Sequence, residues 1–282
     1  MNTLTPAELD EMYNNRARVP GYAAHFARWA ADSAQARQTL RGALDLRYGA
    51  GPLATLDVFP AGTGAPVLVF LHGGYWRSLD KSDHSFVAPP FVAAGVCTVV
   101  LNYDLCPKVG IADIALQVAQ GLAWVWREIA HFGGDRSRIV LAGHSAGGHL
   151  AAMLMTCRWP QVAPRLPAQL VRSALSISGL YDLDPIARTP CLQDLDLTPA
   201  QAVAVSPASF PAPAQGVFYS VVGAEESAEY LRQNRLIRDA WGARVVPVCE
   251  ELPGRQHFSA LEALVEPGHR LQALALQLLR AA

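Results

Sequence analysis

The fold is decided by one stretch near the middle of the chain, Arg138-Ile139-Val140-Leu141-Ala142-Gly143-His144-Ser145-Ala146-Gly147. Its apolar first half, residues 138–142, predicts a strand covered on both faces, and residues 147–156 predict a helix directly behind it. The two glycines of G-x-S-x-G allow a strained turn that lifts the hydroxyl of Ser145 out of the sheet. Ser145 is therefore the candidate nucleophile, and the alternative interpretation is a glycine-rich turn with an N-capping serine.

Predicted strands and helices alternate on both sides of this stretch. Upstream, strands are expected at residues 54–59 (an edge strand), 67–71 and 96–101, followed by a helix at 111–130. Downstream, strands are expected at residues 171–178, 217–222 and 244–248, with helices at 227–241 and 269–280. This alternation predicts an α/β fold, a doubly wound and mostly parallel sheet with helices on both faces. Functional residues are then expected just after the carboxyl ends of the strands.

The first 45 residues differ from this pattern. Thr5-Pro6-Ala7-Glu8 has the hydroxyl, the proline and the acid that start a helix. Residues 22–40 form a second helical run that carries Phe26, Trp29 and Ala30. We therefore expect residues 1–45 to form a helical flank or lid, and residues 46–282 to form the α/β part of a single domain without internal repeats.

Composition excludes several classes of protein. With 51% hydrophobic and 17% charged residues, the 282-residue chain is expected to fold compactly. Its 23 basic and 24 acidic residues give a net charge of −1 and no field for nucleic acid or an anionic membrane. No apolar run reaches the roughly 18 residues of a spanning helix, and residues 1–10 lack a signal-peptide pattern. The sequence predicts a cytoplasmic protein with a small-molecule partner.

Metal and redox chemistry are not predicted. The cysteines are five in number, scattered and without C-x-x-C spacing, so small core residues are expected at Cys97, Cys106, Cys157, Cys191 and Cys249. His144 and His149 lack the glutamate of H-E-x-x-H. We expect no metal site and no cofactor.

A glycine-rich loop, His72-Gly73-Gly74-Tyr75-Trp76, follows the predicted strand at residues 67–71. Such a loop can aim backbone N–H groups at an oxygen that becomes negative, together with the N–H that follows the nucleophile. The candidate oxyanion donors are Gly74 and Tyr75, then Gly73, with Ala146 as their partner. The alternative is a phosphate-binding loop or a plain turn, although neither G-x-G-x-x-G nor G-K-[ST] is nearby.

The side chains around this loop supply candidate binding residues. Tyr75, Trp76 and His144 are expected to contact the substrate, the first two as walls of an acyl pocket, and simple packing is the alternative. His72 is expected to orient the loop by a hydrogen bond rather than to carry a proton.

A serine nucleophile needs a base, and the base needs an acid that fixes its tautomer. His257 lies in a polar loop after the predicted strand 244–248 and is the candidate base, whereas His269 is expected to be solvated. Glu226, which follows the predicted strand 217–222, is the first candidate for the acid. Glu225 and Asp182 remain open as alternatives.

Several segments resemble one known family, the α/β-hydrolase fold and within it the kynurenine formamidase branch near the hormone-sensitive-lipase-like esterases. The motifs are H-G-G-Y-W at residues 72–76, D-K-S-D-H at 80–84, N-Y-D-L-C-P at 102–107, G-H-S-A-G-G-H-L at 143–150, S-G-L-Y-D at 178–182 and H-F at 257–258. Residues 13–20, Y-N-N-R-A-R-V-P, resemble the opening of bacterial members.

The resemblance implies a site and a reaction. The family places its acid in G-x-x-[DE]-S-x-E-[FY], and residues 223–230 match this pattern with Glu226 as the acid. It implies a cofactor-free serine hydrolase that removes the formyl group of N-formylkynurenine, with side activity on small aryl or acyl esters.

Other functions stay open at this stage. A short-chain carboxylesterase, an amidase for another aryl amide, and a non-catalytic binding protein on the same fold are the alternatives. The far end of an amino-acid substrate has four candidate partners, Arg16, Arg18, Arg77 and Lys81. An apolar surface on the N-terminal segment would support a homodimer.

Overall fold

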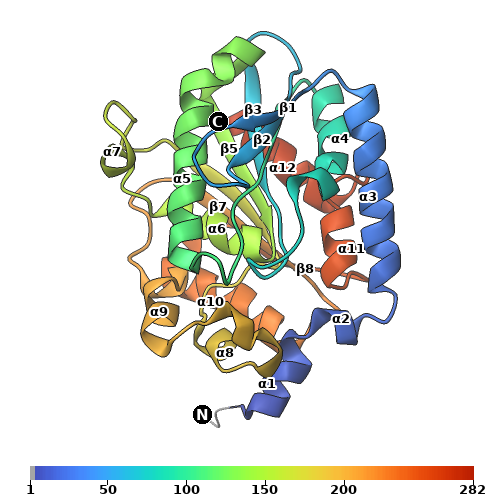
Figure 1. The fold of residues 1–282 in the computed structure, drawn as a ribbon, viewed down its shortest axis with the longest axis vertical. Helices are drawn as coiled ribbons and strands as arrows, with labels where there is room; N and C mark the ends of the chain where they lie inside the picture. Colours follow the sequence, from blue (N-terminus) through green and yellow to red (C-terminus); the bar gives the residue numbers. More distant parts are fainter. Residues whose placement is uncertain (1–3) are drawn as a thin grey trace.

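The computed structural model describes residues 4–282 and is built around one eight-stranded sheet with helices on both faces (Figure 1). In space the strands follow the order β1-β2-β4-β3-β5-β6-β7-β8. The strands β3 to β8 run parallel to their neighbours in this order, and β2 pairs antiparallel with both β1 and β4. The bounds are β1 (Ala43–Arg47), β2 (Thr55–Phe59), β3 (Ala65–Leu71), β4 (Cys97–Leu101), β5 (Gly134–His144), β6 (Ser173–Ile177), β7 (Val217–Gly223) and β8 (Cys249–Leu252).

Two groups of helices cover the two faces of the sheet. One face is covered by α5 (Ile111–Glu128), α6 (Ala146–Met155) and α10 (Ala228–Val245). The other is covered by α3 (Tyr22–Thr39), α4 (Ala88–Ala93), α11 (His257–Glu262) and α12 (Arg270–Ala281). The remaining helices are short: α1 (Pro6–Tyr13), α2 (Asn15–Arg18), α7 (Trp159–Val162), α8 (Asp184–Ala187) and α9 (Pro199–Ala204).

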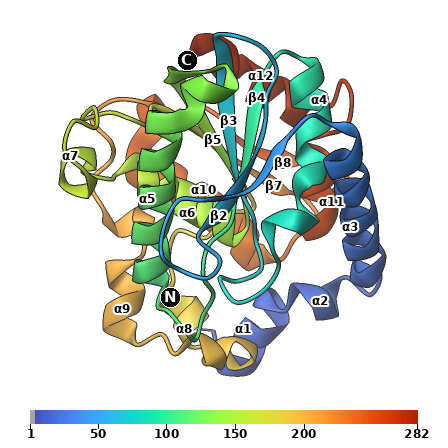
Figure 2. The ribbon, with the colours of Figure 1, turned by 45° about the horizontal axis from the view of Figure 1, so that its top comes forward.

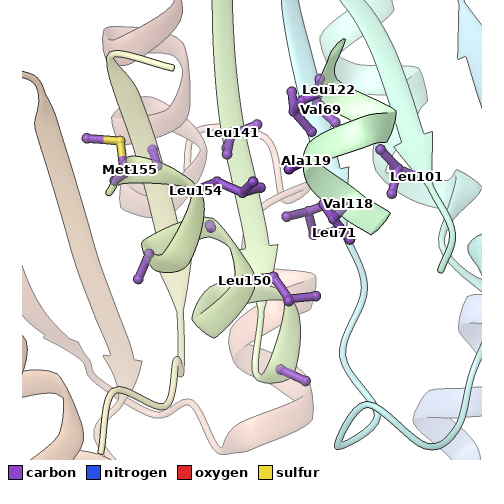
Figure 3. Packing of buried hydrophobic residues seen from close by; sticks show 14 of the residues in the cluster. Val69, Leu71, Leu101, Val118, Ala119, Leu122, Leu141, Leu150, Leu154 and Met155 are labelled. Atoms are coloured by element: carbon purple, nitrogen blue, oxygen red, sulfur yellow. The ribbon is translucent and has the colours of Figure 1, made fainter. Parts of the chain in front are cut away.

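The central strand β3 is apolar throughout because it buries both of its faces. In β3 the side chains of Val67, Val69 and Leu71 join the core under α5 and α6, and those of Leu68 and Phe70 join the core under α3, α4 and α12. Figure 3 shows the first of these cores, where residues of α5 and α6 meet residues of β3, β4 and β5. The doubly wound, mostly parallel sheet expected from the sequence is confirmed.

Three boundaries differ from the expectations. The strand at residues 55–59 is not at the edge of the sheet, because β1 pairs with its outer side. Since β1 begins at Ala43, the expected division at residue 46 falls inside this strand. No strand forms at residues 244–248: α10 continues to Val245, and β8 begins only at Cys249, after Pro247, which has no N–H for a ladder.

The N-terminal helices lie along one end and one side of the sheet. Thr5 starts α1 with a capping box to Glu8, as its sequence predicts. In both views α1 lies beside α8 (Figure 2), and α3 packs along the face that also carries α11. Residues 1–3 of the expected flank lie outside the described part of the chain. None of the helices within residues 4–282 combines the length and apolar character needed to span a bilayer.

Candidate active site

Ser145 lies at the sharp turn between β5 and α6, two elements that adjoin in Figure 1. Its backbone has φ 56° and ψ −118°, a strained conformation for a residue with a side chain. A Cβ on Gly143 would collide with the carbonyl of Gly147, and a Cβ on Gly147 would collide with the carbonyl of Leu71. Both glycines are therefore required for the backbone to pass this close to itself, and the turn holds Ser145 at the carboxyl end of the sheet.

His257 is the first residue of α11 and meets Glu226 in the loop after β7. The distance from His257 Nδ1 to Glu226 Oε2 is 2.6 Å, and both side chains are buried. The other carboxylate oxygen of Glu226 accepts bonds from the Gly223 N–H at 2.8 Å and from the Ser178 hydroxyl. These bonds hold the carboxylate in place, so that Nδ1 of His257 carries the donated proton and Nε2 stays available.

The two alternative acids lie elsewhere. Glu225 is exposed, although it is next to Glu226 in the chain. Asp182 pairs with Arg232 at 3.2 Å. Of the three candidate acids, the structure brings only Glu226 to His257.

A cavity of about 340 Å³ contains Ser145 and His257 in its lining. Segments of the N-terminal part and of α11 contribute to its wall, which includes the aromatic residues Tyr13, Phe26, Trp29, Tyr75 and Phe258. No hydrogen bond joins Ser145 to His257 within residues 4–282, where Nδ1 of His257 is bound to Glu226. In unliganded hydrolases the serine–histidine bond is often long and forms with the substrate.

The candidate oxyanion donors come together beside Ser145. Gly74 and Tyr75 have φ values of 105° and 51°, which turn the loop after β3 toward the cavity, and both residues line it. A Cβ on Gly73 would lie 3.1 Å from Cβ of Ser145. The N–H groups of Gly73, Gly74, Tyr75 and Ala146 have no acceptor within residues 4–282. Unpaired N–H groups at a cavity wall can bind an oxygen with developing negative charge.

The histidines around the loop differ in role. His72 is fully buried behind the loop, where it bonds to the Gly73 carbonyl at 2.8 Å and to the Asn102 side chain at 2.9 Å. His144 lines the cavity and contacts the His257 carbonyl through Nε2 at 2.9 Å. Burial, and then the electrostatic effect of the neighbouring His257, hold the pKa of His144 well below its usual value. His144 therefore adds a neutral surface to the cavity.

Trp76 does not have the expected position. Its side chain has no exposed surface and does not line the cavity. The indole packs edge-on against His149 with ring centroids 4.9 Å apart, and its N–H donates to His149 Nδ1 at 3.2 Å. Trp76 is thus a packing residue between the loop and α6, because the indole gains more from burial there than at an open wall. Tyr75 alone of the pair faces the cavity.

A set of hydroxyl and amide groups behind Tyr75 was not identified from the sequence. The Tyr75 hydroxyl donates to the Tyr13 carbonyl at 2.7 Å and lies 2.6 Å from the Tyr230 hydroxyl, which accepts a bond from Asn15 at 2.9 Å. Since the single proton of Tyr75 goes to Tyr13, Tyr230 donates to Tyr75. The Tyr230 ring also lies 4.7 Å from the ring of His257. The sequence contained a clue to this cluster, because Tyr13, Asn15 and Tyr230 belong to the motifs at residues 13–20 and 223–230.

The cysteines are free thiols with mixed burial. Cys97 and Cys106 are buried, as expected, but Cys157, Cys191 and Cys249 are only partly so. Burial raises the pKa of Cys97 to about 12. Within residues 4–282 no three histidine, cysteine or acidic side chains group in a way that could hold a metal ion.

Comparisons with known proteins show which families this chain is similar to. The family model BD-FAE matches residues 57–163. The kynurenine formamidase of Salmo salar is 32% identical over 87% of this chain and 84% of its own length. That of Danio rerio is 30% identical over 91% of this chain and 88% of its own length. A crystal structure from Silicibacter sp. TM1040, provisionally assigned as a thioesterase, has a TM-score of 0.84 and 34% identity, covering 94% of this chain and 98% of its own.

The sheet order, the serine turn and these similarities define a hydrolase of the α/β-hydrolase superfamily. More closely, the chain belongs to the kynurenine formamidase family, which has esterases among its relatives.

Proposed function

We propose that the protein hydrolyses the formamide bond of N-formylkynurenine-like aryl formamides through an acyl-enzyme on Ser145. The observation that carries the proposal is one aromatic cavity that holds Ser145, the Glu226-bound His257 and the unpaired N–H groups of the loop after β3. Two family members with a formamidase name match most of the chain, which supports the same substrate class.

The proton path follows from the hydrogen bonds of His257. Glu226 binds Nδ1–H, so Nε2 takes the proton of Ser145 as Oγ attacks the formyl carbon. The carbonyl oxygen becomes negative next to the N–H groups of Gly74, Tyr75 and Ala146, with that of Gly73 beside them. His257 then gives the proton to the leaving aryl amine and the C–N bond breaks. Water repeats these steps on the formyl-enzyme and releases formate.

The shape of the cavity fits a small acyl group and an aromatic leaving group. The hydroxyl of Tyr75 is held by Tyr13 and Tyr230, so its ring forms a fixed wall beside the oxyanion donors. Phe26 and Phe258 supply flat apolar surface on another part of the lining. Rigid positioning of the acyl group next to Ser145 favours formyl over bulkier acyl groups.

A comparison of two substrates tests this function. We expect kcat/KM for N-formylkynurenine to exceed that for p-nitrophenyl acetate by orders of magnitude, even though the ester is intrinsically the more reactive compound. A preference for the ester would overturn the formamidase assignment and leave the serine mechanism intact.

The second candidate is a short-chain ester or thioester hydrolase, or an amidase for another aryl amide. It is favoured by the similarity to the provisionally assigned thioesterase, which is as strong as that to the formamidases. A panel of aryl formamides, aryl acetamides and short esters separates these functions. Labelling by a fluorophosphonate that is lost in Ser145→Ala would exclude a non-catalytic binding protein, which predicts no labelling.

A further inference from the structure

The four basic side chains considered for the far end of the substrate have different surroundings. Lys81 has a side chain only 3% exposed, and it pairs with Asp45 at 2.5 Å and Asp57 at 2.8 Å, beneath α3. Arg18 bonds to the Glu11 carbonyl at 3.4 Å and lines a second hollow, which borders Glu226 and His257 but does not include Ser145. Neither of them faces the cavity of Ser145.

Two guanidinium groups do line that cavity, and they differ in charge balance. Arg77 forms an ion pair with Asp194, which lines the same cavity, so the pair is neutral as a unit. Arg16 has neither an ion pair nor a side-chain hydrogen bond within residues 4–282. Arg16 is therefore the one uncompensated cation among the arginines of the cavity wall in the described chain.

Aromatic rings position the Arg16 guanidinium without occupying its donors. Cζ of Arg16 lies 5.5 Å from the ring centroid of Phe26 and 5.8 Å from that of Tyr22, both on α3. Attraction between a cation and the face of an aromatic ring is electrostatic and leaves the N–H groups free. Those N–H groups form a planar fork that matches a carboxylate. Phe26 itself lines the cavity, so the cation and the aromatic wall adjoin.

We propose that Arg16 binds a carboxylate carried by the leaving group of the substrate. The proposal rests on the proposed function, which places the aryl leaving group in this cavity, and it narrows the substrates to aryl formamides or esters with an acidic side arm. The aromatic ring packs against Phe26 and its neighbours, and the acidic arm extends to Arg16 at the mouth. Because the net charge of the chain is only −1, this selectivity is local rather than due to long-range attraction.

The expected change in KM and kcat follows from the position of Arg16 outside the groups that act on the reacting bond. Arg16 is not part of the oxyanion loop or of the Glu226–His257 pair, so it binds ground state and transition state about equally. Loss of such an interaction raises KM and leaves kcat nearly unchanged. A charge-assisted carboxylate–arginine contact contributes about 1.5–3 kcal/mol, so kcat/KM should fall by roughly 10- to 150-fold.

The test uses Arg16→Gln with two matched substrate pairs. The formamide pair is N-formylkynurenine and 2-formamidoacetophenone, which lacks the amino-acid arm. The ester pair is 3-(2-acetoxyphenyl)propanoate and its methyl ester. We expect the variant to lose kcat/KM through KM for the carboxylate member of each pair and to stay within about twofold of wild type for the neutral member.

Control variants and substrates distinguish a failure of the Arg16 proposal from a failure of the proposed formamidase function. Exposed Arg41 does not line the cavity of Ser145, so Arg41→Gln should leave all four substrates unchanged. Arg16→Lys should restore part of the loss. Equal losses on charged and neutral members, or no loss on either, would overturn the role of Arg16. If both formamides are poor substrates and the ester pair still responds to Arg16→Gln, the formamidase function fails and the carboxylate site stands. Unchanged thermal unfolding of Arg16→Gln shows that any loss is not a loss of fold.

Discussion

Glu226 differs from its neighbour Glu225 in burial and in partners, and this difference decides which of them contacts His257. Glu226 is 8% exposed and its carboxylate receives bonds from His257, Gly223 and Ser178. A carboxylate held by several donors keeps one orientation and fixes the imidazole in one tautomer. The proposed base is thus oriented by one carboxylate whose own position is set by three bonds.

The first prediction compares the three acids. Glu226→Gln should lower kcat by about 10³- to 10⁴-fold, because the amide no longer stabilises the imidazolium or its tautomer. Glu225→Gln and Asp182→Asn, the matched controls, should change kcat less than threefold. The measurement is steady-state kinetics on the preferred aryl substrate. A larger loss in either control would move the acid to that residue.

The second prediction concerns the proposed nucleophile and base as a unit. Ser145→Ala, His257→Ala and the double variant should have nearly the same residual rate, about 10³- to 10⁴-fold above the uncatalysed reaction. Exposed Ser209 provides the control Ser209→Ala, which should retain full activity. Multiplicative losses in the double variant would mean that the two side chains act independently, contrary to the proposed mechanism.

At the scale of elements, the turn between β5 and α6 shows how glycine permits a close backbone approach. The Ser145 backbone is strained, and the glycines on either side face carbonyl oxygens with no room for a Cβ. The parallel pairing of β5 with β3 and β6 holds this turn from both sides. The strain at Ser145 is therefore maintained by the sheet rather than by the turn itself.

The third prediction follows from this packing. Gly147→Ala should lower the free energy of unfolding by more than about 3 kcal/mol, or prevent folding, because the new Cβ meets the Leu71 carbonyl. Gly21→Ala is the control, since a Cβ there has nothing within 4 Å, and it should change stability by less than about 1 kcal/mol. Urea unfolding and soluble yield provide the measurement. Equal stabilities of the two variants would contradict the packing argument.

For the whole molecule, several buried histidines link stability to pH. His149 accepts the Trp76 N–H at Nδ1 and donates from Nε2 to the Val205 carbonyl at 2.7 Å, an arrangement that fits only the neutral ring. Burial lowers the pKa of His149 to about 4 and that of His84 to about 3. In the unfolded chain both rings would titrate near 6.5. Between these pH values the unfolded state binds more protons, so stability falls as pH falls.

The fourth prediction is a pH-dependent stability. The free energy of unfolding should decrease between pH 6.5 and 4 by up to about 1.4 kcal/mol per pH unit for each such histidine, and be flat just above pH 7.5. The amide of His149→Gln has both a donor and an acceptor for these two bonds. In this variant the free energy of unfolding should change less steeply with pH, by the contribution of one histidine. Urea unfolding at several pH values measures it. Stability independent of pH from 7 to 5 would contradict this, because it would show that these rings bind protons equally in the folded and unfolded states.

The whole-molecule expectations also include a homodimer and a cytoplasmic location, which stay predictions. The division into a flank and an α/β part is likewise a proposal, supported by the position of α1 and α3 outside the sheet. A bond from the Trp29 N–H to Glu262 at 3.0 Å ties α3 to α11, so the flank and the segment that carries His257 are connected.

Local patterns in the sequence were sufficient to predict the strands from β2 to β7, the turn at Ser145 and the glycine-rich loop after β3. A continuous apolar run indicates a strand buried on both faces, and a glycine in a turn indicates a backbone position with no room for a side chain. The end of α10 and the start of β8 could not be predicted in this way. Residues 245–248 are apolar and fit either element, so only the pairing of β8 with β7 decides between them.

The choice among similar candidate residues depended on contacts between distant segments of the chain. Which carboxylate meets His257, whether Trp76 or Tyr75 faces the cavity, and which arginine remains uncompensated all depend on side chains from distant segments. Charge and residue type are properties of the sequence, but burial and partners arise only when those segments pack together. The residue types around Ser145 were therefore predictable, and the selection among equivalent candidates required the tertiary structure.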